Sequence, residues 1–293
     1  MSITHRPPMN FVLSTVMCLT LGATLLLPGA AHAETLRLGG TGSALGTMKL
    51  LGEGYRKVDP SFVLEIVPNL GSSGGITALT AGAVQVGVIS RPLKVDETAA
   101  GLQAIEYGTT PFVLATAKSG INELSLGQIA DLYSGKQTKW VDGQSVRLVL
   151  RPASDGDSAL LGAFSPAVKI ALAIAMTREG MVIGMTDQDT VDAIERLPGA
   201  IGTASLAVLK SENRRAVALA IDGVAPTVAN LSNGSYPYHK RMYLVVKGAP
   251  GAAVSKFVAF VGSDAGRRIL ADSGHAVAHE QAVAGKAAIK AGR

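Results

Sequence analysis

The sequence predicts an α/β protein of two lobes, each built on mostly parallel strands. Short apolar segments alternate with segments in which apolar residues recur every three or four positions, as expected where strands alternate with helices. The length of 293 residues suggests about two domains. Two predicted strands, at residues 112–115 and 243–246, bracket the second series of elements, so the first lobe is expected to be discontinuous in sequence.

The first lobe is predicted to begin with a strand at residues 35–38, a Gly-rich turn at 39–43 and a helix. The helix is indicated by apolar residues at spacings of three and four: Leu45, Met48, Leu51, Tyr55 and Val58. The next predicted elements are strands at 63–67 and 84–89, a Gly/Ser turn at 71–75 and a helix at 76–83. This βαβαβ order favours parallel strands.

The second lobe continues the pattern. After a strand at residues 111–116, Ser125 and Gln128 form a capping box that begins a helix ending at Gly135. A strand at 146–150 runs into a polar turn at 151–157. The remaining predicted elements are a helix at 191–196, strands at 199–204, 217–221 and 242–246, and a helical tail with Phe257, Phe260 and Val261 on one face. The first lobe is therefore expected at 34–116 plus 244–293, and the second at 117–243.

Residues 1–33 are predicted to be a secretory signal peptide. Arg6 precedes an apolar stretch at 11–27, and small residues at 31 and 33 form a cleavage site after Ala33. The alternative, a membrane anchor, would need roughly 20 apolar residues without the polar interruptions seen here. The single cysteine, Cys18, follows Met17 rather than a small residue, so lipidation is not expected. The mature protein is expected to be soluble, periplasmic and without disulfides.

The composition excludes several classes of protein. With 47% hydrophobic and 17% charged residues, the chain is neither disordered nor a coiled coil. The net charge of +5 is scattered without a basic run, and only 4% of residues are aromatic, so nucleic-acid binding is not expected. A mild positive charge favours weak steering of a small anion.

Three polar turns each follow a strand and open a helix, at residues 42–43, 72–75 and 154–158. Free N–H groups and the helix dipole attract anions to such ends, and ligands of open α/β sheets bind beyond the carboxyl ends of strands. One such turn alone would usually be a plain helix cap. Arg91 and Arg151 also follow strands directly and offer planar donor groups for oxyanions, although surface salt bridges are an equally good interpretation of each.

Six short motifs occur in order along the chain: GTGSA at 40–44, GSSGGI at 71–76, SRPL at 90–93, IADLYSGK at 129–136, GAIG at 199–202, and IDGVAPT at 221–227 leading through Tyr236 and Pro237 to YLVV at 243–246. In this series the sequence resembles the phosphate-binding proteins of phosphate ABC transporters. The resemblance implies the type II periplasmic-binding-protein fold, two α/β lobes joined by two crossover hinge strands. It also implies a monomer that captures a small anion between the lobes and delivers it to an inner-membrane ABC permease.

The same resemblance implies a set of ligand-binding residues. Gly42, Ser43 and Ala44 match the first phosphate loop, with Ala44 where a Thr is often seen. The remaining matches are Ser72 and Ser73 in the second loop, the pair Ser90 and Arg91, the clamping Arg151, and Asp155 and Asp157 in place of the Ser and Thr of a Ser-Gly-Thr motif.

The two aspartates depart from the family pattern. A carboxylate at about 4 Å opposes an anion by roughly 4 kcal/mol at an effective dielectric of about 20. Three interpretations stay open: one carboxylate accepts a hydrogen bond from a protonated phosphate, both turn away as helix caps, or the ligand is a different organic anion or zwitterion. A protein that kept the fold as a ligand-free sensor or interaction partner is a further alternative.

No catalytic motif is present. The sequence lacks a G-x-S-x-G elbow, a P-loop and a G-x-G-x-x-G fingerprint, and His275 and His279 lack the Glu of a zinc-protease helix. We expect neither an enzyme nor a bound metal or cofactor.

Overall fold

The computed structural model describes residues 1–2 and 35–277. The predicted signal peptide with its cleavage site at Ala33, Cys18, and the end of the tail from residue 278 lie outside these residues. Residues 35–277 belong to one compact unit. Among the described helices, none is both long and apolar enough to cross a membrane.

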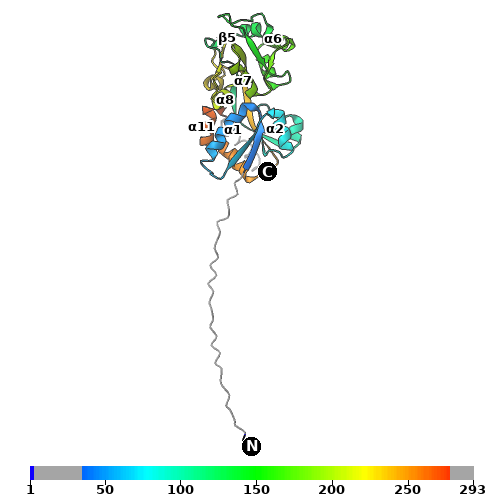
Figure 1. The fold of residues 1–293 in the computed structure, drawn as a ribbon, viewed down its shortest axis with the longest axis vertical. Coiled ribbons are helices and arrows are strands. Elements are labelled where there is room, and N and C mark those ends of the chain that lie inside the picture. The colour runs from blue at the N-terminus through cyan, green and yellow to red at the C-terminus, as the bar shows by residue number, and fades with distance from the viewer. Residues whose placement is uncertain (3–34, 278–293) are drawn as a thin grey trace, which may run out of the picture. The chain divides into compact units, whose positions relative to one another are not determined.

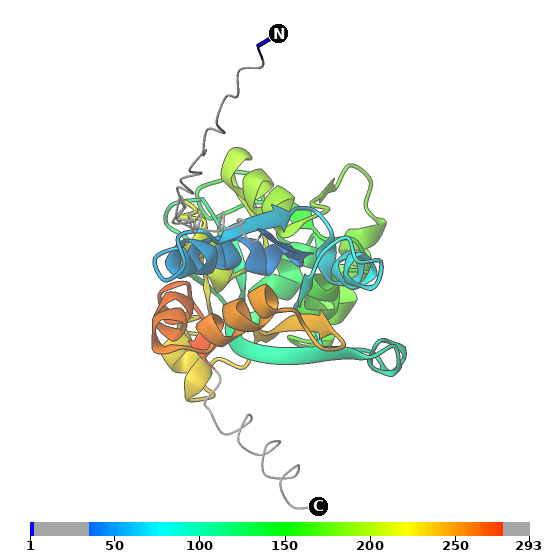
Figure 2. The ribbon, with the colours of Figure 1, turned by 90° about the horizontal axis from the view of Figure 1, so that it is seen from below.

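Two long strands mark where the chain passes between two halves of this unit: one strand runs through both halves, and the other begins at the boundary, since Tyr236 before it packs in one core and Met242 within it packs in the other. They are β4 (Leu102–Thr116) and β11 (His239–Lys247). Up to Pro111, β4 pairs with β11; from Phe112 onward it pairs with β8 (Ala200–Ser205). Figure 2 shows β4 as one long continuous ribbon. The predicted pair of crossover strands is thereby confirmed, whereas domain boundaries at 116 and 243 stay a prediction.

The half that contains the first strand is called the β1 half. Its sheet has the order β2-β1-β3-β11-β4, parallel among the first three strands and antiparallel at β11. Its other elements are β1 (Thr35–Gly40), α1 (Gly42–Tyr55), β2 (Val63–Val67), α2 (Gly71–Thr80), β3 (Val86–Ile89), α3 (Val95–Ala99), α10 (Ala252–Val261), α11 (Asp264–Asp272) and β12 (Ala276–Val277).

The β6 half lies in sequence between the crossing strands. Its sheet continues from β4 through β8 and β6 to β7, with β8, β6 and β7 parallel. Its other elements are β5 (Glu123–Leu124), α4 (Leu126–Ser134), β6 (Arg147–Leu150), α5 (Gly156–Gly162), α6 (Pro166–Thr177), β7 (Val182–Ile183), α7 (Asp187–Arg196), α8 (Leu206–Ser211), β9 (Val217–Ala218), β10 (Ala220–Ile221) and α9 (Val228–Ser232).

Each half has its own hydrophobic core. In the β1 half, α1 and α11 come from opposite ends of the described chain and lie side by side (Figure 1), so close that a methyl group on Gly54 would meet the Ile269 side chain at 2.5 Å. In the β6 half, the indole of Trp140 is buried and donates to the Gly199 carbonyl oxygen at 2.9 Å. The cores of the two halves hold the two parts of β4, and the core of the β1 half holds β11, which positions the groups that project from these strands.

The structure corrects two local predictions and confirms a third. The helix α2 begins at Gly71, so the predicted Gly/Ser turn is its first turn. Val58 lies beyond the end of α1 and is 68% exposed, because the chain leaves the helix at Tyr55 and the apolar spacing no longer applies. The capping box at Ser125 and the left-handed Gly135 at the end of α4 are confirmed, with a φ of 82° at the glycine.

Candidate anion-binding site

The N-termini of three helices meet beside a crossing strand. These are α1 of the β1 half, and α5 and α7 of the β6 half. The Ser43 hydroxyl in α1 donates to Asp187 Oδ1 in α7 at 2.5 Å, which joins the two halves directly. Six residues form this site and are called the buried charge cluster: Ser43, Arg151, Asp155, Asp157, Asp187 and Lys240.

Lys240 occupies the centre of the buried charge cluster. It projects from β11 and is 2% exposed, with its ammonium 5.5 Å from the centre of the Phe112 ring. Lys240 Nζ lies 2.5 Å from Asp157 Oδ1 and donates to Ser43 Oγ at 2.8 Å. It also lies 3.2 Å from Asp187 Oδ1. One side chain of a crossing strand therefore contacts both halves.

Arg151 enters the cluster from the carboxyl end of β6. It is 6% exposed and donates to Asp155 Oδ2 at 2.7 Å and to the Gly184 carbonyl oxygen at 3.1 Å. Its Nε is buried and has no hydrogen-bond partner among the described residues. Asp155 is also the N-cap of α5, since its Oδ1 accepts from the Asp157 backbone N–H at 2.8 Å. Asp155 therefore acts as a helix cap and holds Arg151, whereas Asp157 turns inward to Lys240.

Neutral groups of the β1 half lie at the ends of β1 and β3. The Ser90 hydroxyl is 3.3 Å from Thr41 Oγ1 and 3.4 Å from Ser72 Oγ, and its backbone N–H donates to Ser72 Oγ. Thr41 directly precedes the helix that carries Ser43. We call Thr41, Ser72 and Ser90 the hydroxyl cluster. It supplies donors and acceptors without a net charge.

Burial and neighbouring charges shift the ionisation of the buried charge cluster. Burial, aided by the charges of Asp187 and Asp155, raises the pKa of Asp157 to about 6 despite the attraction of Lys240. Burial alone would also raise the pKa of Asp187, but Lys240 and Arg151 lower it below its usual value. The carboxylates raise the pKa of Lys240 although burial opposes this. Asp187 and Lys240 are therefore both charged at neutral pH.

The structure brings together only some of the residues predicted from the sequence. Ser43, Arg151, Asp155 and Asp157 meet in the buried charge cluster, and Ser72 and Ser90 in the hydroxyl cluster. The Gly42 carbonyl oxygen accepts from Gln188 Nε2 of α7 at 3.0 Å. A side chain at Gly42 would collide with Asp187 and Gln188, so glycine permits the close approach of α1 and α7.

Three other predicted residues point elsewhere. Arg91 forms a two-pronged ion pair with Glu97, at 2.7 and 2.8 Å. Ser73 is exposed on the first turn of α2, and the Ala44 side chain is packed into the core of the β1 half. The structure thus favours the salt-bridge interpretation of Arg91.

The sequence-based prediction missed Lys240 and Asp187. A signal for Lys240 was present, since alternation along β11 puts residue 240 on the same face as the buried Met242. Asp187 follows Thr186, whose capping box with Asp189 marks the start of α7. An acid at the first position of a helix is common, so this signal does not distinguish Asp187 from an ordinary surface residue.

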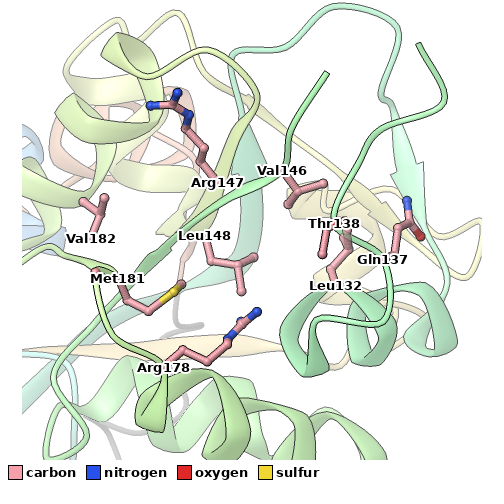
Figure 3. A pocket seen from close by; sticks show the side chains of 10 residues that line it. Leu132, Gln137, Thr138, Val146, Arg147, Leu148, Arg178, Met181 and Val182 are labelled. Atoms are coloured by element: carbon pink, nitrogen blue, oxygen red, sulfur yellow. The ribbon is translucent and has the colours of Figure 1, made fainter. Parts of the chain in front are cut away.

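A separate cavity lies in the β6 half, away from the residues of both clusters. It measures about 310 Å³ and is lined by Leu132, Gln137, Thr138, Val146, Arg147, Leu148, Arg178, Gly180, Met181 and Val182. Figure 3 shows the Arg147 and Arg178 side chains directed to different sides, and Arg178 donates to the Tyr133 carbonyl oxygen. Its cations do not converge on one point, so this cavity lacks the geometry of an anion site. Among the described residues, no cluster of His, Cys, Asp or Glu is suited to a metal ion.

The structure has two α/β halves joined by two crossing strands, and polar groups of both halves meet between them. This arrangement defines a bilobal solute-binding protein of the type II periplasmic class. Residues 28–265 match the family described as PBP superfamily domain. The chain belongs to this superfamily.

Known relatives include phosphate-binding proteins. The chain is 26% identical over 217 residues to the phosphate-binding protein PstS of Bacillus subtilis, covering 70% of this chain and 68% of the relative. It is 33% identical over 106 residues to PstS 2 of Streptococcus agalactiae, but this match spans only 36% of either chain. A Clostridium perfringens substrate-binding protein solved with bound phosphate aligns with a TM-score of 0.69 and 25% identity, covering 84% of this chain and all of that one.

Proposed function

We propose that the protein captures phosphate between its two halves and delivers it to an ABC permease. The observation that carries the proposal is the convergence of a hydroxyl from the β1 half, Ser43, with two buried cations, Arg151 and Lys240. Charge-assisted donors in a buried site are the groups that an oxyanion needs. The named function of the Bacillus subtilis relative supports the choice of phosphate.

In this proposal the ligand-contacting residues come from both halves. Ser43 and the N-terminal turn of α1 offer donors on one side, and Arg151 offers its unpartnered Nε on the other. Ser72 and Ser90 add hydroxyl groups that accept or donate as the protonation of phosphate requires. The protein acts by binding alone, as an exported periplasmic monomer released from its signal peptide near Ala33.

Thermal unfolding of the purified, phosphate-stripped protein tests this function. Phosphate, sulfate, molybdate, and a panel of organic anions and amino acids are compared at fixed pH and ionic strength. We expect phosphate to raise the unfolding temperature, since a ligand at about 100 times its Kd adds about 2.7 kcal/mol to the free energy of unfolding.

The alternatives give different results. A response to another solute but not to phosphate would mean that Asp157 and Asp187 have changed the specificity of the site. No response to any solute would favour an interaction protein that kept only the fold.

A further inference from the structure

We propose that Asp187 is an internal competitor of the bound anion: its carboxylate occupies the anion position between the halves, and an incoming oxyanion must displace it. The inference rests on the proposed phosphate-binding function. It assigns to Asp187 a specificity-determining role that the resemblance to phosphate-binding proteins does not imply.

The contacts of Asp187 are those of a bound anion. Its Oδ1 accepts from Ser43 Oγ at 2.5 Å and lies 3.2 Å from Lys240 Nζ. Its Oδ2 lies against the first residue of α1, since a methyl group on Gly42 would be only 2.8 Å from it. A carboxylate at a helix N-terminus, with a hydroxyl and an ammonium as donors, reproduces the surroundings expected of an oxyanion.

The donors that surround Asp187 are closed to solvent. Asp187 is 6% exposed, Lys240 2% and Ser43 1%. A tetrahedral oxyanion therefore reaches Ser43 and Lys240 only if the Asp187 carboxylate moves away.

The charges of the cluster favour displacement over joint binding. Arg151 and Lys240 are the two cations, whereas Asp155, Asp157 and Asp187 are carboxylates. With every group ionised, the cluster already carries an excess of one negative charge, and a further anion beside Asp187 would be repelled. When α7 carries Asp187 away from α1, the two donors become available to phosphate.

The same contact connects the two halves. Asp187 and Gln188 follow each other at the start of α7, and both bond to the start of α1, at Ser43 and at the Gly42 carbonyl oxygen. Removal of the Asp187 charge is therefore expected to loosen this junction as well as to free the donors. These two consequences are measured independently.

The first measurement is phosphate affinity, by calorimetry at constant pH and ionic strength, for the wild type and Asp187→Asn. We expect Asp187→Asn to bind phosphate about tenfold more tightly or better, since removal of a nearby like charge gains about 1.4 kcal/mol or more. The matched control is Asp189→Asn, which removes an exposed acid from the same helical turn and should leave the Kd within about twofold. Weaker binding by Asp187→Asn would overturn the inference, because it would make Asp187 a partner of the ligand.

The second measurement is made without phosphate. Spin labels at the exposed Lys49 of α1 and Ile170 of α6 report the distance between the halves. We expect a broader or longer distance distribution for Asp187→Asn than for the wild type, and an unchanged distribution would overturn the inference. If neither protein binds phosphate, the proposed function fails, and this distance still decides whether Asp187 joins the halves.

Discussion

Apart from Lys240 on β11, the β1 half meets the candidate site with neutral groups, whereas the β6 half meets it with charged ones. The Ser90 hydroxyl lies 3.3 Å from that of Thr41 and 3.4 Å from that of Ser72, and the Ser90 backbone N–H donates to Ser72 Oγ at 3.2 Å. On the other side the buried Arg151 pairs with the partly exposed Asp155, and Asp157 forms a buried pair with Lys240 of the crossing strand. A ligand between the halves would therefore contact one surface held by neutral hydrogen bonds and another held by ion pairs.

This difference has an energetic consequence. When a hydroxyl loses one hydrogen-bond partner, the free energy of unfolding falls little, because the net contribution of a neutral hydrogen bond is about 1 kcal/mol. A buried charge that loses its partner costs about 3 to 5 kcal/mol. We therefore expect substitutions on the charged side to affect stability and binding together, and the following predictions test that contrast.

The largest effect is expected for Arg151→Ala. The substitution leaves the buried charge cluster with three carboxylates and one cation, Lys240. We expect the free energy of unfolding to fall by about 3 kcal/mol or more, and the Kd for phosphate to rise about tenfold or more. Chemical denaturation and calorimetry measure the two effects. A protein of wild-type stability and affinity would show that Arg151 serves only the local structure of α5.

A smaller but still large effect is expected for Lys240→Met. The methionine keeps most of the side-chain volume but leaves Asp157 and Asp187 without their shared cation, so we expect a loss of about 3 kcal/mol. The double variant Lys240→Met with Asp157→Asn is the matched control. Because it removes both members of the close pair, it should recover about half of the loss. Additive losses in the double variant would contradict a direct coupling between these two residues.

The contrast also explains how much of the site the sequence predicts. A Gly/Ser turn after a strand is a local pattern, so Ser43 and Ser72 are recognised without knowledge of the fold, as is the capping box at Ser125, whereas Ser90 is indicated by the family resemblance. Order along the chain also predicts the two crossing strands. These features depend on residues that are neighbours in sequence.

Charge compensation depends instead on residues far apart in sequence. The partners of Ser43 are 144 and 197 positions away, at Asp187 and Lys240. No local pattern links these three residues, and only the packing of α1 against α7 and β11 brings them together. Arg91 illustrates the reverse case: an arginine that follows a strand is compatible with an anion clamp, but in the structure its guanidinium pairs with Glu97, six positions on.

The smallest effect is expected for Arg91→Ala, whose ion pair with Glu97 is partly exposed. The Arg91 guanidinium lowers the pKa of Glu97 from 4.5 to about 2. A carboxyl whose pKa is lower in the folded state stabilises the fold above its unfolded pKa, and this contribution is lost as the pH falls from about 4.5 to about 2. The wild type should therefore exceed Arg91→Ala in stability by at most about 1 kcal/mol at neutral pH, and the difference should shrink below pH 4.5.

Stability curves from pH 2 to pH 7 measure this difference, with Glu97→Gln as the control that removes the titrating group. We expect Arg91→Ala to bind phosphate with a Kd within about twofold of the wild type, because its guanidinium is already held by Glu97 and lies outside both clusters. A tenfold loss of affinity in Arg91→Ala would move this arginine into the site. The β1 half would then contribute a second charge besides Lys240, and the contrast between a mainly neutral and a charged side would no longer hold.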